Sequence, residues 1–149
     1  MGILLTQTYP VATVGALVVN ERGEILIVKS KKWHDKHTVP GGHIELGETA
    51  ETAIQREVKE ETGLDVEPVE LLIVQQAIYP KDFYRHDHYI FMDYVCRTTK
   101  PGQEVQLDGV ELQHYLWAKP EEALKLDLEH FTRNFVVKYL EQGKSAAKS

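Results

Sequence analysis

The first thirty positions show apolar runs separated by a turn signal. Residues 11–19 form an apolar run rich in valine, and the sequence NERG follows at 20–23. A second apolar run, EILIVK at 24–29, comes directly after that turn. Short apolar runs bounded by turn residues are typical of buried β-strands, so the pattern predicts a β-hairpin at the start of the chain.

Beyond the hairpin, the polar segment 30–38 is expected to be a loop, and VPGG at 39–42 is expected to interrupt regular structure. Further strands are predicted at 43–45, 64–78, 87–97 and 111–118. Helices are predicted at 49–62, 120–124 and 128–140. Strands followed by a helix, more strands and more helices indicate an α/β fold with a mixed sheet covered by helices.

The helix at 49–62 carries an unusual distribution of charge. Ala50, Ile54 and Val58 recur every four residues and define its apolar stripe, with Thr49 as the expected N-cap and Gly63 as the stop. With Ile54 at zero and about 100° per residue, Glu61 lies near −20°, Glu57 near −60° and Glu60 near −120°. Three carboxylates therefore lie on an arc that begins inside the buried stripe.

This acidic arc is unfavourable without a partner, because burying an unpaired carboxylate is costly and like charges four residues apart repel. Arg56 reaches Glu60, but one cation does not neutralise three anions. Hard oxygen ligands on one face suit Mg²⁺ or Mn²⁺ rather than zinc. The alternative is a solvated acidic helix face. The glycine-rich segment just before the helix favours a ligand site, since Gly41 and Gly42 let backbone groups approach a ligand closely.

Composition narrows the classes of function. The chain has 149 residues and a net charge of −6, which argues against nonspecific nucleic-acid binding. The single Cys96 fits a reducing compartment, no apolar run reaches the ~20 residues of a membrane helix, and no signal peptide is evident, so we expect a cytoplasmic protein without a membrane segment. Residues 143–149, GKSAAKS, are expected to be a flexible tail, which leaves 1–142 as one domain.

One segment of 23 residues carries a complete motif. Gly42 is followed after five residues by Glu48, and after seven more by REVKEETGL at 56–64. All nine specified positions match the signature box of the Nudix hydrolases, which the chain therefore resembles. The resemblance implies a Nudix-type α/β/α sandwich with a mixed β-sheet, and hydrolysis of a diphosphate linkage in a nucleoside diphosphate linked to another moiety. It also implies a small-molecule nucleotide substrate and, because relatives are often dimers, a homodimer as one expected state.

The resemblance further implies roles for individual residues. Glu57, Glu60 and Glu61 would hold the divalent ions, helped by the carbonyl of Gly41. Arg56 would orient these carboxylates, and Glu48 would pair with Arg56 or reach a metal through water.

The residue that removes a proton from the attacking water is left open between the box and a later loop. Glu57 or Glu60 of the box could serve, since a carboxylate near the water can act as general base. In some relatives the base lies in a later loop, where Glu111 is the candidate here, with Asp108 and Glu104 as alternatives. Glu111 could equally be an exposed carboxylate at a strand end.

Substrate contacts are expected from Lys29, Trp33, Gly42 and Tyr84. Each has a structural alternative: Lys29 could be a solvated lysine at a strand end, and Trp33 could be a core anchor. The spacing from Leu64 to Pro80 resembles the subgroup that hydrolyses ADP-ribose. Two histidine pairs, His34 with His37 and His86 with His88, lack metal-type spacing and are expected to be solvated.

Three kinds of function remain open at this stage. The first is a Mg²⁺-dependent pyrophosphohydrolase, with ADP-ribose hydrolysis as a specific form. The second is a nucleotide-binding sensor that has lost turnover, which should have lost box residues. The third is an interaction domain whose glutamates pair with lysines from elsewhere. The intact box favours the enzyme, but the sequence does not identify the nucleotide.

Overall fold

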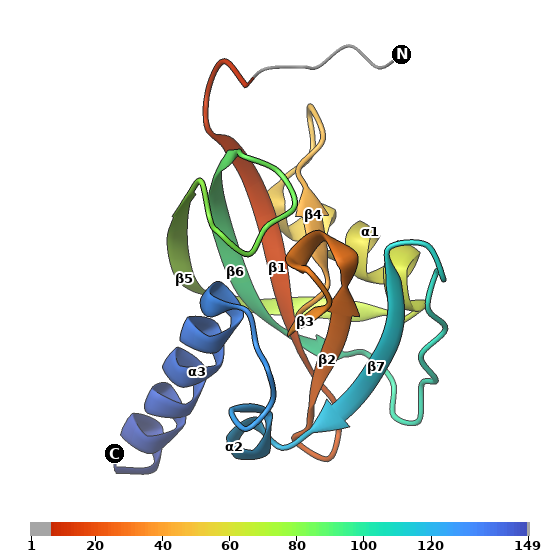
Figure 1. Cartoon of the computed structure of the whole chain (residues 1–149). Coiled ribbons are helices and arrows are strands. Elements are labelled where there is room, and N and C mark those ends of the chain that lie inside the picture. The colour runs from red at the N-terminus through yellow and green to blue at the C-terminus, as the bar shows by residue number, and fades with distance from the viewer. Residues whose placement is uncertain (1–6, 149) are drawn as a thin grey trace.

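The computed structural model describes residues 7–148 and confirms an α/β fold (Figure 1). The elements are β1 (Val11–Val19), β2 (Ile25–Ser30), the 3₁₀ turn η1 (Lys31–Trp33), β3 (Lys36–Thr38), β4 (Gly41–His43), α1 (Ala50–Thr62), β5 (Val66–Ile78), β6 (His88–Thr98), β7 (Leu112–Ala118), α2 (Pro120–Ala123) and α3 (His130–Lys148).

The strands form one mixed sheet. Its main path runs β3-β2-β1-β6-β5, with β4 paired to β1 and β7 paired to β2. Strands β1 and β6 are parallel, whereas every other pair is antiparallel. Strand β1 contacts β2 only near Val19 and pairs with β4 at its other end, so it diverges from β2 and leaves space there for a site.

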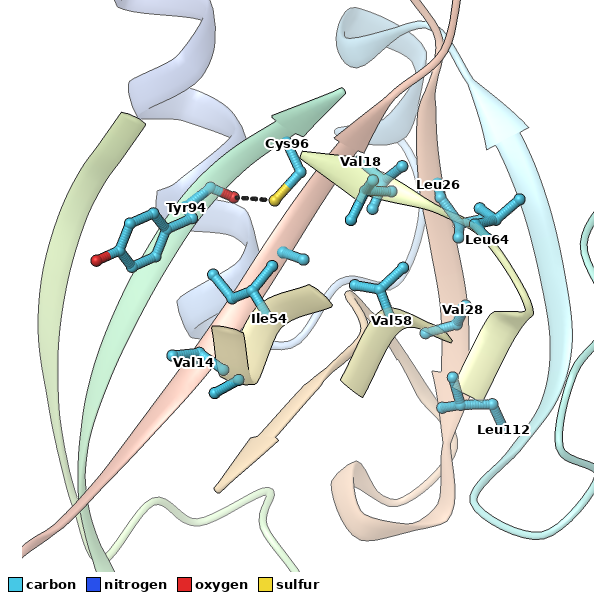
Figure 2. Packing of buried hydrophobic residues seen from close by; sticks show 13 residues of the cluster. Val14, Val18, Leu26, Val28, Ile54, Val58, Leu64, Tyr94, Cys96 and Leu112 are labelled. Atoms are coloured by element: carbon cyan, nitrogen blue, oxygen red, sulfur yellow. Dashed lines mark hydrogen bonds between the residues drawn. The ribbon is translucent and has the colours of Figure 1, made fainter. Parts of the chain in front are cut away.

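Helices cover both faces of the sheet. Helix α1 packs against the face that contains Val14, Val18 and Leu26, and Figure 2 shows Ile54 and Val58 directed into this core. Helices α2 and α3 pack on the opposite face through a second core. Because alternate residues of β1 pack into the two cores, residues 13–19 of this strand are buried on both sides of the sheet.

Helix α1 begins and ends as the sequence predicts. The Thr49 side chain accepts a hydrogen bond from the backbone of Thr52, and Gly63 ends the helix in the left-handed conformation with φ of 75°. Glu61 is only 4% exposed, which confirms that the acidic arc begins inside the buried stripe.

Three local expectations were wrong. The segment 30–38 contains η1 and β3 rather than only a loop, because Ser30 caps the turn and β3 pairs with β2. Gly41 and Gly42 form β4 instead of interrupting regular structure. Glycine at position 41 allows β4 to pair closely with β1, because a side chain there would collide with the carbonyl oxygen of Val14. Helix α3 continues to Lys148, because the small residues after Gly143 are compatible with a helix.

None of the helices in the described part of the chain is long and apolar enough to cross a membrane.

Candidate active site

A cavity of about 640 Å³ extends from α1 to the start of α3. One end is acidic and is formed by α1, β4 and the loop before β7. The other end is aromatic and is formed by η1, the loop between β5 and β6, β6 itself and the first turn of α3. A cavity of this size accommodates a ligand with a charged part and a flat apolar part.

The acidic end contains the three glutamates of the box. Glu57, Glu60 and Glu61 all line the cavity, on the α1 face next to β4. The backbone N–H of Gly41 donates to Glu61 Oε2 at 3.3 Å. A Cβ at Gly42 would lie 2.5 Å from the carboxyl carbon of Glu57, so glycine is required there for the carboxylate to occupy this position.

Glu61 has the most unfavourable electrostatic environment of these residues. Burial, hydrogen bonding with Glu57 and the negative charges of Glu57 and Glu111 raise the pKa of Glu61 well above its usual range. The backbone hydrogen bond from Gly41 acts in the opposite direction but is the weaker influence. Additional positive charge is therefore needed at this end of the cavity if all of these carboxylates are to be ionised.

Arg56 organises the acidic end without neutralising it. Its guanidinium donates to both carboxylate oxygens of Glu48, at 2.7 and 2.8 Å, and to Glu57 at 3.0 Å. It also donates to the His43 carbonyl at 3.0 Å and to Glu60 at 3.4 Å. Hydrogen bonds from Arg56 lower the pKa of Glu48 to about 2. The bidentate pair fixes the guanidinium, which in turn positions Glu57.

The donor set at this end fits a hard divalent cation. Among the described residues, no three carboxylate, histidine or cysteine side chains already stand in a metal-binding arrangement. The side chain of Glu60 is 60% exposed and pairs with Arg56 at 3.4 Å. Several carboxylate oxygens around one buried carboxyl group are the chemistry that Mg²⁺ and Mn²⁺ prefer.

The loop before β7 contributes the candidate bases outside the box. Glu111 lines the cavity and pairs with Lys32 at 3.1 Å. Asp108 also lines it, but its Oδ1 accepts from the backbone of Val110 and Leu112, which gives Asp108 a structural role. Glu104 is not among the residues of the cavity wall.

Of the four residues expected to contact the substrate, the structure brings three together. Trp33, Gly42 and Tyr84 line the cavity, whereas Lys29 lines a separate hollow of about 340 Å³. The next residue along β2, Ser30, lines the cavity, whereas Lys29 does not.

Most of the aromatic end was missed from the sequence. Phe83, Phe91 and Phe131 surround Trp33, with ring centroids 4.7 to 6.2 Å away. Asp93 and Glu129 lie in the same part of the cavity wall. A single acidic residue within the apolar strand sequence HYIFMDYVC was the available signal for Asp93, because acidic residues are rarely placed in a buried strand without a function.

Comparisons with known proteins agree with the fold and with the box. The family model described as NUDIX domain matches residues 9–139. A segment of 63 residues is 46% identical to the 8-oxo-dGDP phosphatase of Mus musculus, covering 41% of this chain and 20% of that protein. A segment of 79 residues is 38% identical to the NAD-capped RNA hydrolase NudC of Haemophilus influenzae, covering 50% of this chain and 30% of that protein.

A solved structure resembles almost the whole chain. The MutT protein of Methanosarcina mazei has a TM-score of 0.73 at 24% identity, covering 93% of this chain and 99% of that one. The chain belongs to the NUDIX domain family, and the two curated relatives are an 8-oxo-dGDP phosphatase and an NAD-capped RNA hydrolase. Since the match spans less than a third of either curated relative, the activity of this chain is a matter for proposal.

Proposed function

We propose that this protein is a divalent-cation-dependent pyrophosphohydrolase that cleaves a diphosphate linkage in a nucleotide. The observation that carries the proposal is the environment of Glu61, a buried carboxyl group placed against two other acidic residues at one end of a cavity. Such an arrangement is costly for a structural protein and useful for one that binds cations and a polyphosphate.

Each residue at the acidic end has a separate task in this proposal. Glu57, Glu60 and Glu61, with the Gly41 carbonyl, would hold Mg²⁺ or Mn²⁺. When bound, the cation supplies positive charge that neutralises the diphosphate and makes phosphorus more electrophilic. Arg56, fixed by Glu48, positions Glu57 through the 3.0 Å hydrogen bond.

Glu111 is our candidate for the residue that accepts the proton of the attacking water. It lines the cavity from outside α1, and its partner Lys32 leaves one of its oxygens free to accept. Glu57 and Glu60 remain the alternatives within the box. A comparison of pH–rate profiles for Glu111→Gln and Glu60→Gln separates them, because loss of the base removes the acidic limb of the profile.

The aromatic end supports a nucleotide rather than inorganic pyrophosphate as substrate. Aromatic side chains in a cavity wall can bind nucleobases by stacking. We propose that the substrate is a small-molecule nucleotide, in line with the negative net charge of the chain. We also propose that the protein acts in the cytoplasm, in line with the free, buried Cys96. ADP-ribose is one member of this class. A sensor without turnover is disfavoured because the box residues are intact.

The proposal is tested with a substrate panel. Nucleoside triphosphates, ADP-ribose, nucleotide sugars, dinucleoside polyphosphates and NAD-capped RNA are incubated with the protein and Mg²⁺, and the products are separated by chromatography. We expect cleavage within a diphosphate, loss of activity in EDTA and recovery on adding Mg²⁺ or Mn²⁺. Full activity in metal-free buffer, or no cleavage of any substrate class, contradicts the proposal.

A further inference from the structure

The aromatic end of the cavity has a polar residue at its base. Asp93 lies on β6 and is 5% exposed, and the aromatic side chains of Trp33, Phe91 and Phe131 lie in the same part of the wall. Within the part of the chain whose side chains are described, Asp93 forms no ion pair and has one hydrogen-bond partner, Gln75. A buried carboxyl group with so few partners destabilises the fold unless it serves another purpose.

The orientation of Asp93 is fixed by Gln75. The Gln75 amide nitrogen donates to Asp93 Oδ2 at 2.9 Å and to the Phe131 carbonyl at 2.8 Å. The Gln75 amide oxygen accepts from Asn134 at 3.0 Å. Because every part of the Gln75 amide has a partner, the amide cannot flip, and Oδ2 of Asp93 is always the oxygen that accepts.

The second oxygen, Oδ1, remains available to a ligand. It lies beside Gly15, where a Cβ would be only 2.5 Å away, so a larger residue at position 15 would displace the carboxyl group. No hydrogen bond to Oδ1 is made by the described residues. Glu129 differs, because its carboxylate accepts from the backbone of Phe131 at 2.8 Å and Thr132 at 2.7 Å and thereby caps α3.

Asp93 holds a proton readily in this setting. Burial raises the pKa of Asp93 to about 7, and the negative charge of nearby Glu129 adds to the effect, although the hydrogen bond from Gln75 opposes it. Since Oδ2 accepts from Gln75, the proton resides on Oδ1. Below pH 7 most molecules therefore present an O–H donor to the aromatic end of the cavity.

We propose that Asp93 is a specificity-determining residue whose Oδ1–H donates a hydrogen bond to a carbonyl oxygen on the outer edge of a nucleobase that packs against the aromatic side chains of the cavity wall. The inference rests on the proposed function, because the acidic end must hold the phosphates for the base to reach Asp93. A purine with an oxygen at position 6 accepts this hydrogen bond. A purine with an amino group at position 6 would place that donor against the O–H donor of Asp93. The buried O–H would then have no acceptor, which is strongly disfavoured.

The test uses two nucleotides that differ at that position, inosine and adenosine monophosphate. Binding is measured by calorimetric titration at pH 6 in the presence of Mg²⁺, since a monophosphate has no diphosphate linkage to be cleaved, and kcat/KM is measured for the corresponding triphosphates under the same conditions. We expect wild-type protein to prefer the inosine compound at least about tenfold in both assays, with the difference in KM rather than kcat.

Two variants at Asp93 make the test specific. Asp93→Asn should retain the preference within about threefold, because the amide nitrogen replaces the O–H as a donor. Asp93→Val, of similar size but without a donor, should reduce the preference to less than about twofold. Asp127→Asn is the matched control, since Asp127 pairs with Lys36 outside the cavity, and it should behave as wild type. Asp93→Ala replaces the valine variant if the latter does not fold.

The inference is overturned if wild-type protein does not discriminate between the two monophosphates, or if Asp93→Val or Asp93→Ala keeps the full preference. Failure of the proposed function has a different signature. Selective binding of inosine monophosphate without hydrolysis of any nucleotide would refute the proposed reaction while leaving the role of Asp93 intact.

Discussion

The two ends of the cavity each contain a buried carboxyl group, and they differ in how its charge is accommodated. Glu61 lies against Glu57 and Glu111, so its surroundings are already negative and attract a cation. Asp93 lies among aromatic rings with a neutral amide as its partner, so it retains a proton instead. Under the two proposals, the same functional group would serve as a metal ligand at one end and as a hydrogen-bond donor at the other, according to its neighbours.

The largest effect on activity is expected from substitutions of the glutamates at the acidic end. Glu57→Gln or Glu61→Gln should lower kcat by about 10²–10⁴-fold, because charge stabilisation in the transition state is lost. The fold should persist, since each change relieves repulsion between like charges. Steady-state rates at saturating Mg²⁺ and a thermal melt measure both effects. Glu121→Gln on α2 is the control, and wild-type rates in the two α1 variants would refute the site assignment.

A smaller effect is expected when the orientation of the acidic end is loosened. Arg56→Lys retains a positive charge but cannot make the bidentate pair with Glu48. We expect the half-saturating concentration of Mg²⁺ to rise about 10- to 100-fold, which is the loss of metal affinity typical when a group that orients metal ligands is removed. The activity is titrated with Mg²⁺, and an unchanged half-saturating concentration would show that Arg56 has only a structural role.

The buried Asp93 at the aromatic end should make the free energy of unfolding depend on pH. Because the folded-state pKa of Asp93 is about 7 against an ordinary value of 3.8, its stabilising contribution is present below pH 4 and is lost as the pH rises through 7. Asp93→Asn removes this titration. The melting temperature of the variant relative to wild type, measured in EDTA, should therefore rise by several degrees between pH 4 and pH 8. A difference that stays constant over this range contradicts the assignment of a protonated Asp93.

The smallest effect concerns Lys29, which lies outside the cavity despite its position at the end of β2. Lys29→Ala should change kcat/KM by less than about twofold, because Lys29 does not line the cavity and solvent and salt screen its charge. Lys32→Ala, which removes the partner of Glu111, is the informative comparison and should have the larger effect. Equal losses in both variants would mean that the phosphates extend into the smaller hollow.

The acidic end was predictable because it is encoded locally. Glu57, Glu60 and Glu61 lie on one helix, so the helical repeat alone places them on one arc, and Gly42 is only a short loop away. The aromatic end combines η1, β5, β6 and α3, which are distant in sequence. Asp93 looks like any polar residue in a strand until Gln75 and Asn134 are brought beside it. The position of Lys29 was equally hard to foresee, because the pairing of β2 with β7 shifts between Lys29 and Ser30.

The central claim is that the acidic end binds divalent cations, and the most direct measurement is titration with Mn²⁺ monitored by electron paramagnetic resonance. In the presence of a nucleoside monophosphate, wild-type protein and Glu121→Gln should remove free Mn²⁺ from solution in a saturable manner. Glu57→Gln and Glu61→Gln should bind at least about tenfold more weakly. Equal Mn²⁺ binding by all four proteins would contradict the account.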